Sequence, residues 1–182
     1  RYAPSRPLTD LGNAERFVDR FGGNAIYVPN LSAWYVWNGL RWVRSDLGEI
    51  EQLAKAAVRG IHDEASREKD QSKRDSLLAH ERKSESASSI QNLIKLAVAE
   101  QGMSAPGEAL DRDGYVLGVQ NGTLDLRTGE LMPPNPEHYI TLASAATFDP
   151  QAKCPRWMQF LQEVTGGDAA MMEFLQRCVG YT

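Results

Sequence analysis

The dipeptide Asn38-Gly39 lies between two runs of aromatic and β-branched residues and limits the possible folds of this chain more than any other feature. Asn-Gly strongly favours a two-residue type I′ turn, so the flanking residues 34–37 and 40–44 should form a β-hairpin. A third extended run, residues 25–28, precedes them. Both faces of the predicted hairpin are largely apolar, so each face needs packing partners.

The two-residue turn also predicts which residues of the hairpin face each other. Trp37 lies opposite Leu40, Val36 opposite Arg41, and Tyr35 opposite Trp42, with side chains alternating between the faces. Exposed rings beside Arg41 and Arg44 would form a stacking platform for single-stranded nucleic acid. We favour the alternative, in which the rings are buried against Phe17, Phe21 and neighbouring helices.

Apolar residues at helical spacing predict helices on both sides of this hairpin. The first begins at Thr9 or Asp10, and the next begins at Asp46 with Glu49 three residues on, as in a capping box. Residues 62–85 are almost wholly polar and predict a solvated, interrupted helix. Another helix contains residues 90–97. Two carboxyl-terminal helices follow, with apolar core-facing stripes, Gly166-Gly167 as the break and Asp168 as the second cap.

Residues 115–131 predict a three-stranded meander with turns at Asn121-Gly122 and Thr128-Gly129. Its faces separate by polarity. Leu117, Val119, Leu124, Leu126 and Leu131 should form the buried face, and Gln120, Thr123, Asp125, Arg127 and Glu130 the solvated face. A short strand at residues 139–142 should follow.

The charge balance restricts how the chain can bind nucleic acid. Its 182 residues include 20 Lys+Arg and 24 Asp+Glu, for a net charge of -4, so DNA contact requires a local cationic patch. Arg82 and Lys83 are candidates, since they lie close to a predicted helix start where N–H groups could bind phosphate. The alternative is a solvated helix end with a Ser cap. Arg16, Arg59, Lys73 and Arg74 are lesser candidates.

Catalytic motifs are missing from the sequence. No phosphate-binding loop, dinucleotide fingerprint, zinc-protease helix or nucleophile elbow occurs. Asp111 and Asp113 could hold a divalent cation, but two carboxylates are an incomplete ligand shell and a solvated turn is favoured. His62, His80 and His138 are interpreted as surface residues, and Cys154 and Cys178 as buried, reduced thiols. We therefore predict no catalytic or metal site in this chain, with a metal-dependent nuclease or nucleotidyl transferase using Asp111 and Asp113 as the alternative.

Several phrases, taken in order, resemble one known family. They are residues 9–18, the hairpin at 34–42, Glu81-Arg-Lys-Ser-Glu-Ser, Val119-Gln-Asn-Gly-Thr-Leu-Asp-Leu-Arg-Thr-Gly-Glu-Leu, and Cys154-Pro-Arg-Trp-Met-Gln-Phe-Leu with the run from Phe174 to Tyr181. Together they resemble the helicase-associated amino-terminal domain of phage and plasmid primase-helicases, which is related to part of the poxvirus primase-helicase. One departure is the run 116–119, where Gly118 stands in place of a polar residue.

The resemblance implies a noncatalytic DNA-replication module that precedes a superfamily three, hexameric AAA+ helicase motor. The complete protein would use ATP and Mg, unwind DNA and form the hexamer, while this fragment would hold no cofactor. Implied partners are single-stranded or forked DNA and the motor and primase domains of the same polypeptide. The implied location is the bacterial host cytoplasm, and we expect no membrane partner. Candidate DNA-binding residues are Arg41, Trp42, Arg44, Arg82 and Lys83.

The expected fold is α+β. An aromatic β-hairpin and a three-stranded meander should pack against four or five helices, and two carboxyl-terminal helices should end the chain. We expect a flexible leader at residues 1–8 and a helicase-associated domain at 9–182. Within that domain we expect two subdomains, 9–101 and 114–182, joined by a loop.

Overall fold

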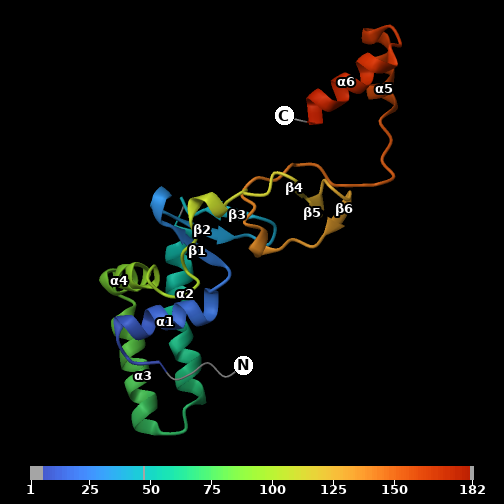
Figure 1. The fold of residues 1–182 in the computed structure, drawn as a ribbon. Helices are drawn as coiled ribbons and strands as arrows, with labels where there is room; N and C mark the ends of the chain where they lie inside the picture. The colour runs from blue at the N-terminus through green and yellow to red at the C-terminus, as the bar shows by residue number, and fades with distance from the viewer. Residues whose placement is uncertain (1–5, 47, 181–182) are drawn as a thin grey trace. The chain divides into compact units, whose positions relative to one another are not determined.

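The computed structural model describes residues 6–46 and 48–180. Within them it contains six α-helices and two three-stranded antiparallel sheets, which confirms the predicted α+β class (Figure 1). The chain divides into two compact units between Phe148 and Asp149. The first unit contains α1 (Asp10–Phe21), β1 (Ala25–Val28), β2 (Ala33–Trp37), β3 (Trp42–Arg44), α2 (Glu49–Arg67), α3 (Gln71–Ser84), α4 (Ala87–Ala97), β4 (Val116–Val119), β5 (Gly122–Asp125) and β6 (Glu130–Met132). The second contains α5 (Pro155–Thr165) and α6 (Ala169–Gly180).

Helix α1 begins where its sequence predicts. Thr9 is the cap, and its hydroxyl oxygen accepts a hydrogen bond from the backbone N–H of Gly12 at 3.1 Å. Of the predicted leader, residues 1–5 lie outside the described residues. Arg6 is held by ion pairs with Asp19 at 2.8 Å and Glu15 at 3.4 Å.

The hairpin of β2 and β3 forms as predicted, but its turn is longer. Trp37 pairs with Trp42, so a four-residue loop replaces the two-residue turn and the predicted register was wrong by two residues. The side-chain oxygen of Asn38 accepts hydrogen bonds from the backbone N–H groups of Leu40 and Arg41, each at 2.9 Å, and these bonds close the wider turn. A shift of two residues leaves every strand side chain on its predicted face.

The start of α2 differs from the predicted capping box. The helix begins at Glu49, and the Ser45 hydroxyl oxygen accepts a hydrogen bond from the backbone N–H of Ile50 at 3.0 Å. Asp46 was wrongly predicted as the cap, because its carboxylate forms an ion pair with Arg44 at 3.0 Å instead.

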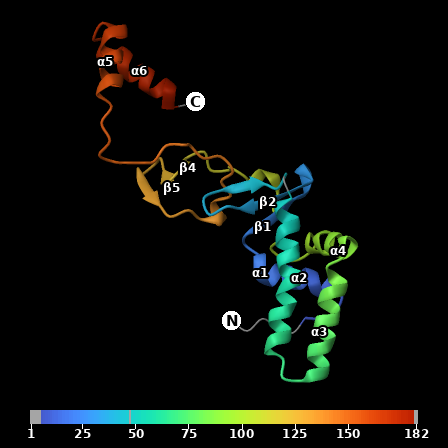
Figure 2. The ribbon, with the colours of Figure 1, turned by 180° about the vertical axis from the view of Figure 1, so that it is seen from behind.

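The predicted interrupted helix is confirmed as the end of α2 and all of α3, which lie side by side (Figures 1 and 2). Asp70 starts α3, and its carboxylate accepts a hydrogen bond from the backbone N–H of Lys73 at 3.0 Å. His62 and Glu81 connect the two helices at 3.3 Å. Ser86 caps α4, where its hydroxyl oxygen accepts from the N–H of Ser89.

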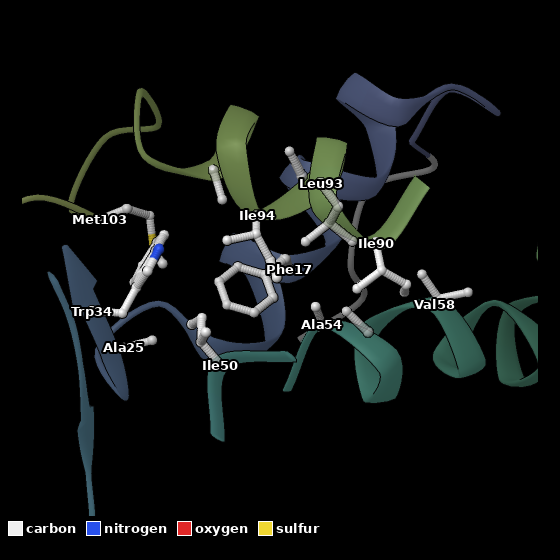
Figure 3. Close-up of a cluster of buried hydrophobic side chains, with 13 residues drawn as sticks. Phe17, Ala25, Trp34, Ile50, Ala54, Val58, Ile90, Leu93, Ile94 and Met103 are labelled. Carbon is white, nitrogen blue, oxygen red and sulfur yellow. The ribbon is translucent and has the colours of Figure 1, made fainter. Parts of the chain in front are cut away.

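Phe17 lies in the middle of the main hydrophobic core, with Trp34 and Met103 to one side and Ile90 and Val58 to the other (Figure 3). Its side chain is fully buried, and its ring contacts Trp34 edge-on at 6.2 Å between centroids. The buried cluster joins α1, α2, α4 and the first sheet; it consists of Ala14, Phe17, Ala25, Trp34, Ile50, Ala54, Ala57, Val58, Ile90, Leu93, Ile94, Ala97 and Met103.

The opposite face of the first sheet is also covered. Ile26, Val28, Trp42 and Ala105 form a second buried cluster. The chain reaches this face through the loop after α4, where the backbone N–H of Ala105 donates to the Tyr27 carbonyl at 3.0 Å. The loop at 101–113, expected to join two subdomains, thus hydrogen-bonds to β1, and the division between compact units lies at Phe148 and Asp149.

The second sheet has the predicted three strands, but its two faces do not separate by polarity as predicted. Thr123, expected on the solvated face, is fully buried. The segment after residue 142 lies alongside β4, where Ala143 forms a parallel bridge with Gly118 and the N–H of Ser144 donates to the Gly118 carbonyl at 2.8 Å. Three leucines of the expected buried face are exposed: Leu117, Leu126 and Leu131. The face prediction was therefore wrong at these positions.

The strand predicted at residues 139–142 was wrong. Tyr139 has a positive φ of 51° after a short 3-10 helix, Pro136–His138. The next residues bond to other elements. The Ile140 carbonyl accepts from the backbone N–H of Trp42 at 2.8 Å, and the backbone N–H of Thr141 donates to the Asp111 carboxylate at 2.7 Å.

The second unit has the two predicted helices but not the predicted core. The Asp168 carboxylate caps α6, accepting from the N–H of Ala170 at 2.9 Å. Among its described residues only Leu161 is buried, while Trp157, Phe160, Val164, Met171, Phe174 and Val179 are exposed. Cys154 and Cys178 are also exposed, so their predicted burial was wrong. Two short helices enclose too little volume to bury both stripes.

Replacing Phe17 by Ala should lower the free energy of unfolding by about 3–5 kcal/mol, since a fully buried ring is removed from the cluster. The matched control is Leu11→Ala on the same helix, whose side chain is 51% exposed. Urea denaturation should show a change within about 0.5 kcal/mol for the control. Equal losses in both variants would contradict the position assigned to the core.

Candidate nucleic-acid interface

The two hairpin arginines in the predicted DNA-binding set both have partners within the protein. The guanidinium of Arg41 donates to the Thr141 carbonyl at 2.6 Å, and Arg44 forms its ion pair with Asp46. The Arg44 side chain is still 56% exposed. Arg44 is therefore exposed, whereas Arg41 is half-buried and its guanidinium already donates one structural hydrogen bond.

Trp42, the aromatic member of that set, is buried. It is 2% exposed, its indole N–H donates to the Pro136 carbonyl at 2.9 Å, and its ring stacks on Tyr139 at 6.3 Å. The interpretation that the hairpin tryptophans are core residues is confirmed for Trp34 and Trp42. A base cannot stack on the ring of Trp42 in this conformation, because stacking requires an exposed face.

Arg82 and Lys83 lie in the last turn of α3, not at the start of a helix. Helix α4 begins shortly after them, at Ala87 with Ser86 as its cap, so they lie close to a helix start as predicted, and the solvated helix end with a Ser cap is also present. Both side chains are exposed, and neither forms an ion pair with the described residues. Positive charge at this end of a helix is favourable because the exposed carbonyls carry partial negative charge.

The carboxylates of Asp111 and Asp113 serve two separate structural contacts. Asp111 accepts hydrogen bonds from the backbone and the hydroxyl of Thr141. Asp113 pairs with the Arg127 guanidinium at 2.7 and 3.1 Å, and this contact holds the pKa of Asp113 below its ordinary value. No group of three potential metal ligands occurs in the described part of the chain.

His80 is buried, so its interpretation as a surface histidine was wrong. Its Nε2 lies 2.9 Å from the Asn13 side-chain oxygen and 3.3 Å from the Ser84 hydroxyl, while the Asn13 amide donates to Ser84 at 2.9 Å. These three buried polar side chains connect α1 to α3. Burial lowers the pKa of His80, and the nearby positive charge of Arg16 lowers it further.

Arg16 forms a second polar connection, which the sequence did not reveal. Its buried guanidinium pairs with the Glu64 carboxylate at 2.8 Å and donates to the carbonyls of Pro7 and Arg6 at 2.8 and 2.9 Å. The sequence contains nineteen other arginines and lysines that would be equally plausible partners of Glu64 in a one-dimensional pattern, so only the α1–α2 packing identifies this pair.

These features define an α+β module whose buried polar groups and paired carboxylates hold elements together. A protein-family model described as "D5 N terminal like" matches residues 14–166. The chain therefore belongs to this family, the helicase-associated N-terminal domains of phage and plasmid primase-helicases, which confirms the resemblance found in its motifs. Domains of this family are noncatalytic parts of primase-helicases. No curated protein matches the chain.

None of the helices in the described residues has the length and apolar character needed to cross a membrane.

The buried histidine predicts a pH dependence of stability. The folded-state pKa of His80 lies below its ordinary 6.5, so on acidification the unfolded chain binds a proton that the folded chain does not. The free energy of unfolding should therefore fall as pH falls from 6.5 toward the folded-state pKa. His80→Gln should reduce this dependence in urea denaturations across that range, whereas the exposed control His62→Gln should not. An unchanged slope for His80→Gln would contradict the assignment.

Proposed function

We propose that this chain is a noncatalytic replication module that couples a primase-helicase motor to DNA. The observation that carries the proposal is the family match over residues 14–166. Exposed cations at the end of α3 support DNA contact, because phosphate binding needs positive charge that is not already paired.

The contact set that we propose for DNA is the hairpin pair, Arg41 and Arg44, with the α3 pair, Arg82 and Lys83. The α3 pair should contribute more, since both of its side chains are exposed and free of ion pairs among the described residues. A DNA phosphate must compete with the Asp46 carboxylate for Arg44, and with the Thr141 carbonyl for Arg41. Trp42 is left out of the set because its ring is buried.

In the complete protein the module would lie between a primase domain and a hexameric AAA+ helicase motor of the superfamily three type. Nucleotide hydrolysis, with ATP and Mg, would belong to the motor, and the hexamer would form only in the full-length protein. Single-stranded or forked DNA in the cytoplasm of a bacterial host would be the shared substrate. These assignments follow from the role of such domains within primase-helicases.

A second role, contact with a neighbouring protein domain, is favoured by one observation in the second unit. Helices α5 and α6 expose large apolar side chains, and Trp157 and Phe160 stack at 5.6 Å on the surface. Exposed apolar groups of this size are typical of protein interfaces. We propose that α5 and α6 pack against the motor domain and contribute to ring assembly.

Reversing the α3 pair, Arg82→Glu with Lys83→Glu, should weaken binding of the chain to oligo(dT) and flatten its salt dependence. The slope of log affinity against log salt should fall by about 1.4, because two phosphate contacts are lost. Fluorescence anisotropy titrations over a range of salt concentrations measure both effects.

The matched control reverses two other exposed cations of the first unit, Lys69 and Lys95, and leaves the net charge equal to that of the test variant. It should retain most of the affinity. Salt-insensitive behaviour of the unmodified chain would contradict the DNA contact and favour the protein-contact role of α5 and α6.

A further inference from the structure

A groove of about 460 Å³ lies between α1 and α2 in the first unit. Its α2 residues recur three and four positions apart, so a single face of α2 lines it. Helix α1 contributes Arg20. The lining residues are Arg20, Gln52, Lys55, Ala56, Arg59, Gly60 and Asp63.

Positive charge exceeds negative charge in this groove, although the whole chain has a net charge of -4. Arg20 and Lys55 are exposed and form no ion pair with any described residue. Arg59 lies 3.5 Å from the Glu85 carboxylate in a contact between exposed side chains. Such a contact contributes little, so the Arg59 charge remains accessible to an anion. Asp63 is the one carboxylate in the lining.

The guanidinium of Arg20 is held in place over α2. Its Nη1 donates to the Ala56 carbonyl at 3.3 Å, and its central carbon lies 5.7 Å from the centroid of the Phe21 ring. Gly60 provides the space for it, because a Cβ at that position would lie 2.2 Å from Nη1. Because Nη1 is the far end of a flexible, exposed side chain, an alanine at position 60 would displace the guanidinium and leave the helix in place.

We infer that this groove binds backbone phosphates of single-stranded DNA, with Arg20 as the positioned cation and Lys55 and Arg59 as its neighbours. A guanidinium presents a planar pair of donors that matches the geometry of a phosphate, and a side chain already held in place loses less freedom on binding. The inference rests on the proposed DNA contact but assigns it to residues outside the hairpin and the end of α3.

Gly60→Ala is the variant that tests the positioning of Arg20, because it alters no charge. Its added methyl group should displace the guanidinium while favouring the helix, so the affinity for labelled oligo(dT) should fall roughly threefold, the scale of one phosphate contact. The urea midpoint of the same variant should stay unchanged or rise. A general loss of folding would lower both quantities together.

Four further variants complete the experiment. Arg20→Ala and Lys55→Ala should each weaken binding roughly threefold at low salt, and Asp63→Asn should strengthen it by removing the opposing charge. The control Lys95→Ala, on the exposed side of α4, should bind like the unmodified chain.

Unchanged affinity in Arg20→Ala and Lys55→Ala would overturn the groove as a phosphate site. If those variants bind normally while the reversed Arg82 and Lys83 pair loses affinity, the groove inference fails and the proposed function stands. If the unmodified chain does not bind oligo(dT), both the groove and the proposed DNA contact are refuted. Tight binding by Gly60→Ala would overturn the positioning role of Arg20.

Discussion

Burial of Phe17 is the interaction on which the rest of the first unit depends. The ring lies among side chains of α1, α2, α4 and the first sheet, so a single cluster fixes how these elements pack. Polar connections also start from α1, where Arg16 pairs with Glu64 of α2 and Asn13 hydrogen-bonds to His80 of α3. Their hydrogen bonds offset the cost of burying polar groups and allow only one alignment of the three helices. The position of every surface cation on α1, α2 and α3 follows from that alignment.

Two kinds of charged residue result from this packing. Arg16, Arg127 and Asp113 have strong partners, and their charges hold segments of the chain together. Arg20, Lys55, Arg82 and Lys83 have no ion-pair partners among the described residues and remain available to an external anion. In the proposed role, this acidic chain would bind DNA through such local surfaces, because the charges nearest a phosphate contribute most when salt screens the others. This division supports the role of a binding and coupling module within a primase-helicase.

The sequence predicted the elements better than it predicted their surroundings. Helical spacing and caps such as Thr9 and Asp168 are local, so the helices and most strands were found. The turn after Trp37 was predicted too short because the Asn38 side chain favours a wider loop than the dipeptide rule implies. His80 and Thr123 were expected at the surface, yet both are buried, and His80 bonds to Asn13, which is distant in the sequence. The cations at Arg82 and Lys83 were identified correctly as exposed, while the Arg20 site depends on a contact with Gly60 that no one-dimensional pattern shows.

The central claim is that this polypeptide positions DNA and a neighbouring motor without a reactive centre of its own. The most direct test measures nucleotide hydrolysis, strand separation and primer synthesis by the purified chain, with Mg²⁺ present, beside the complete primase-helicase. The account predicts that the chain alone shows none of these activities above background. The complete protein, which contains the motor and the primase, should show them. Robust turnover by the chain alone in any of the three assays, lost on Asp111→Ala, would contradict it.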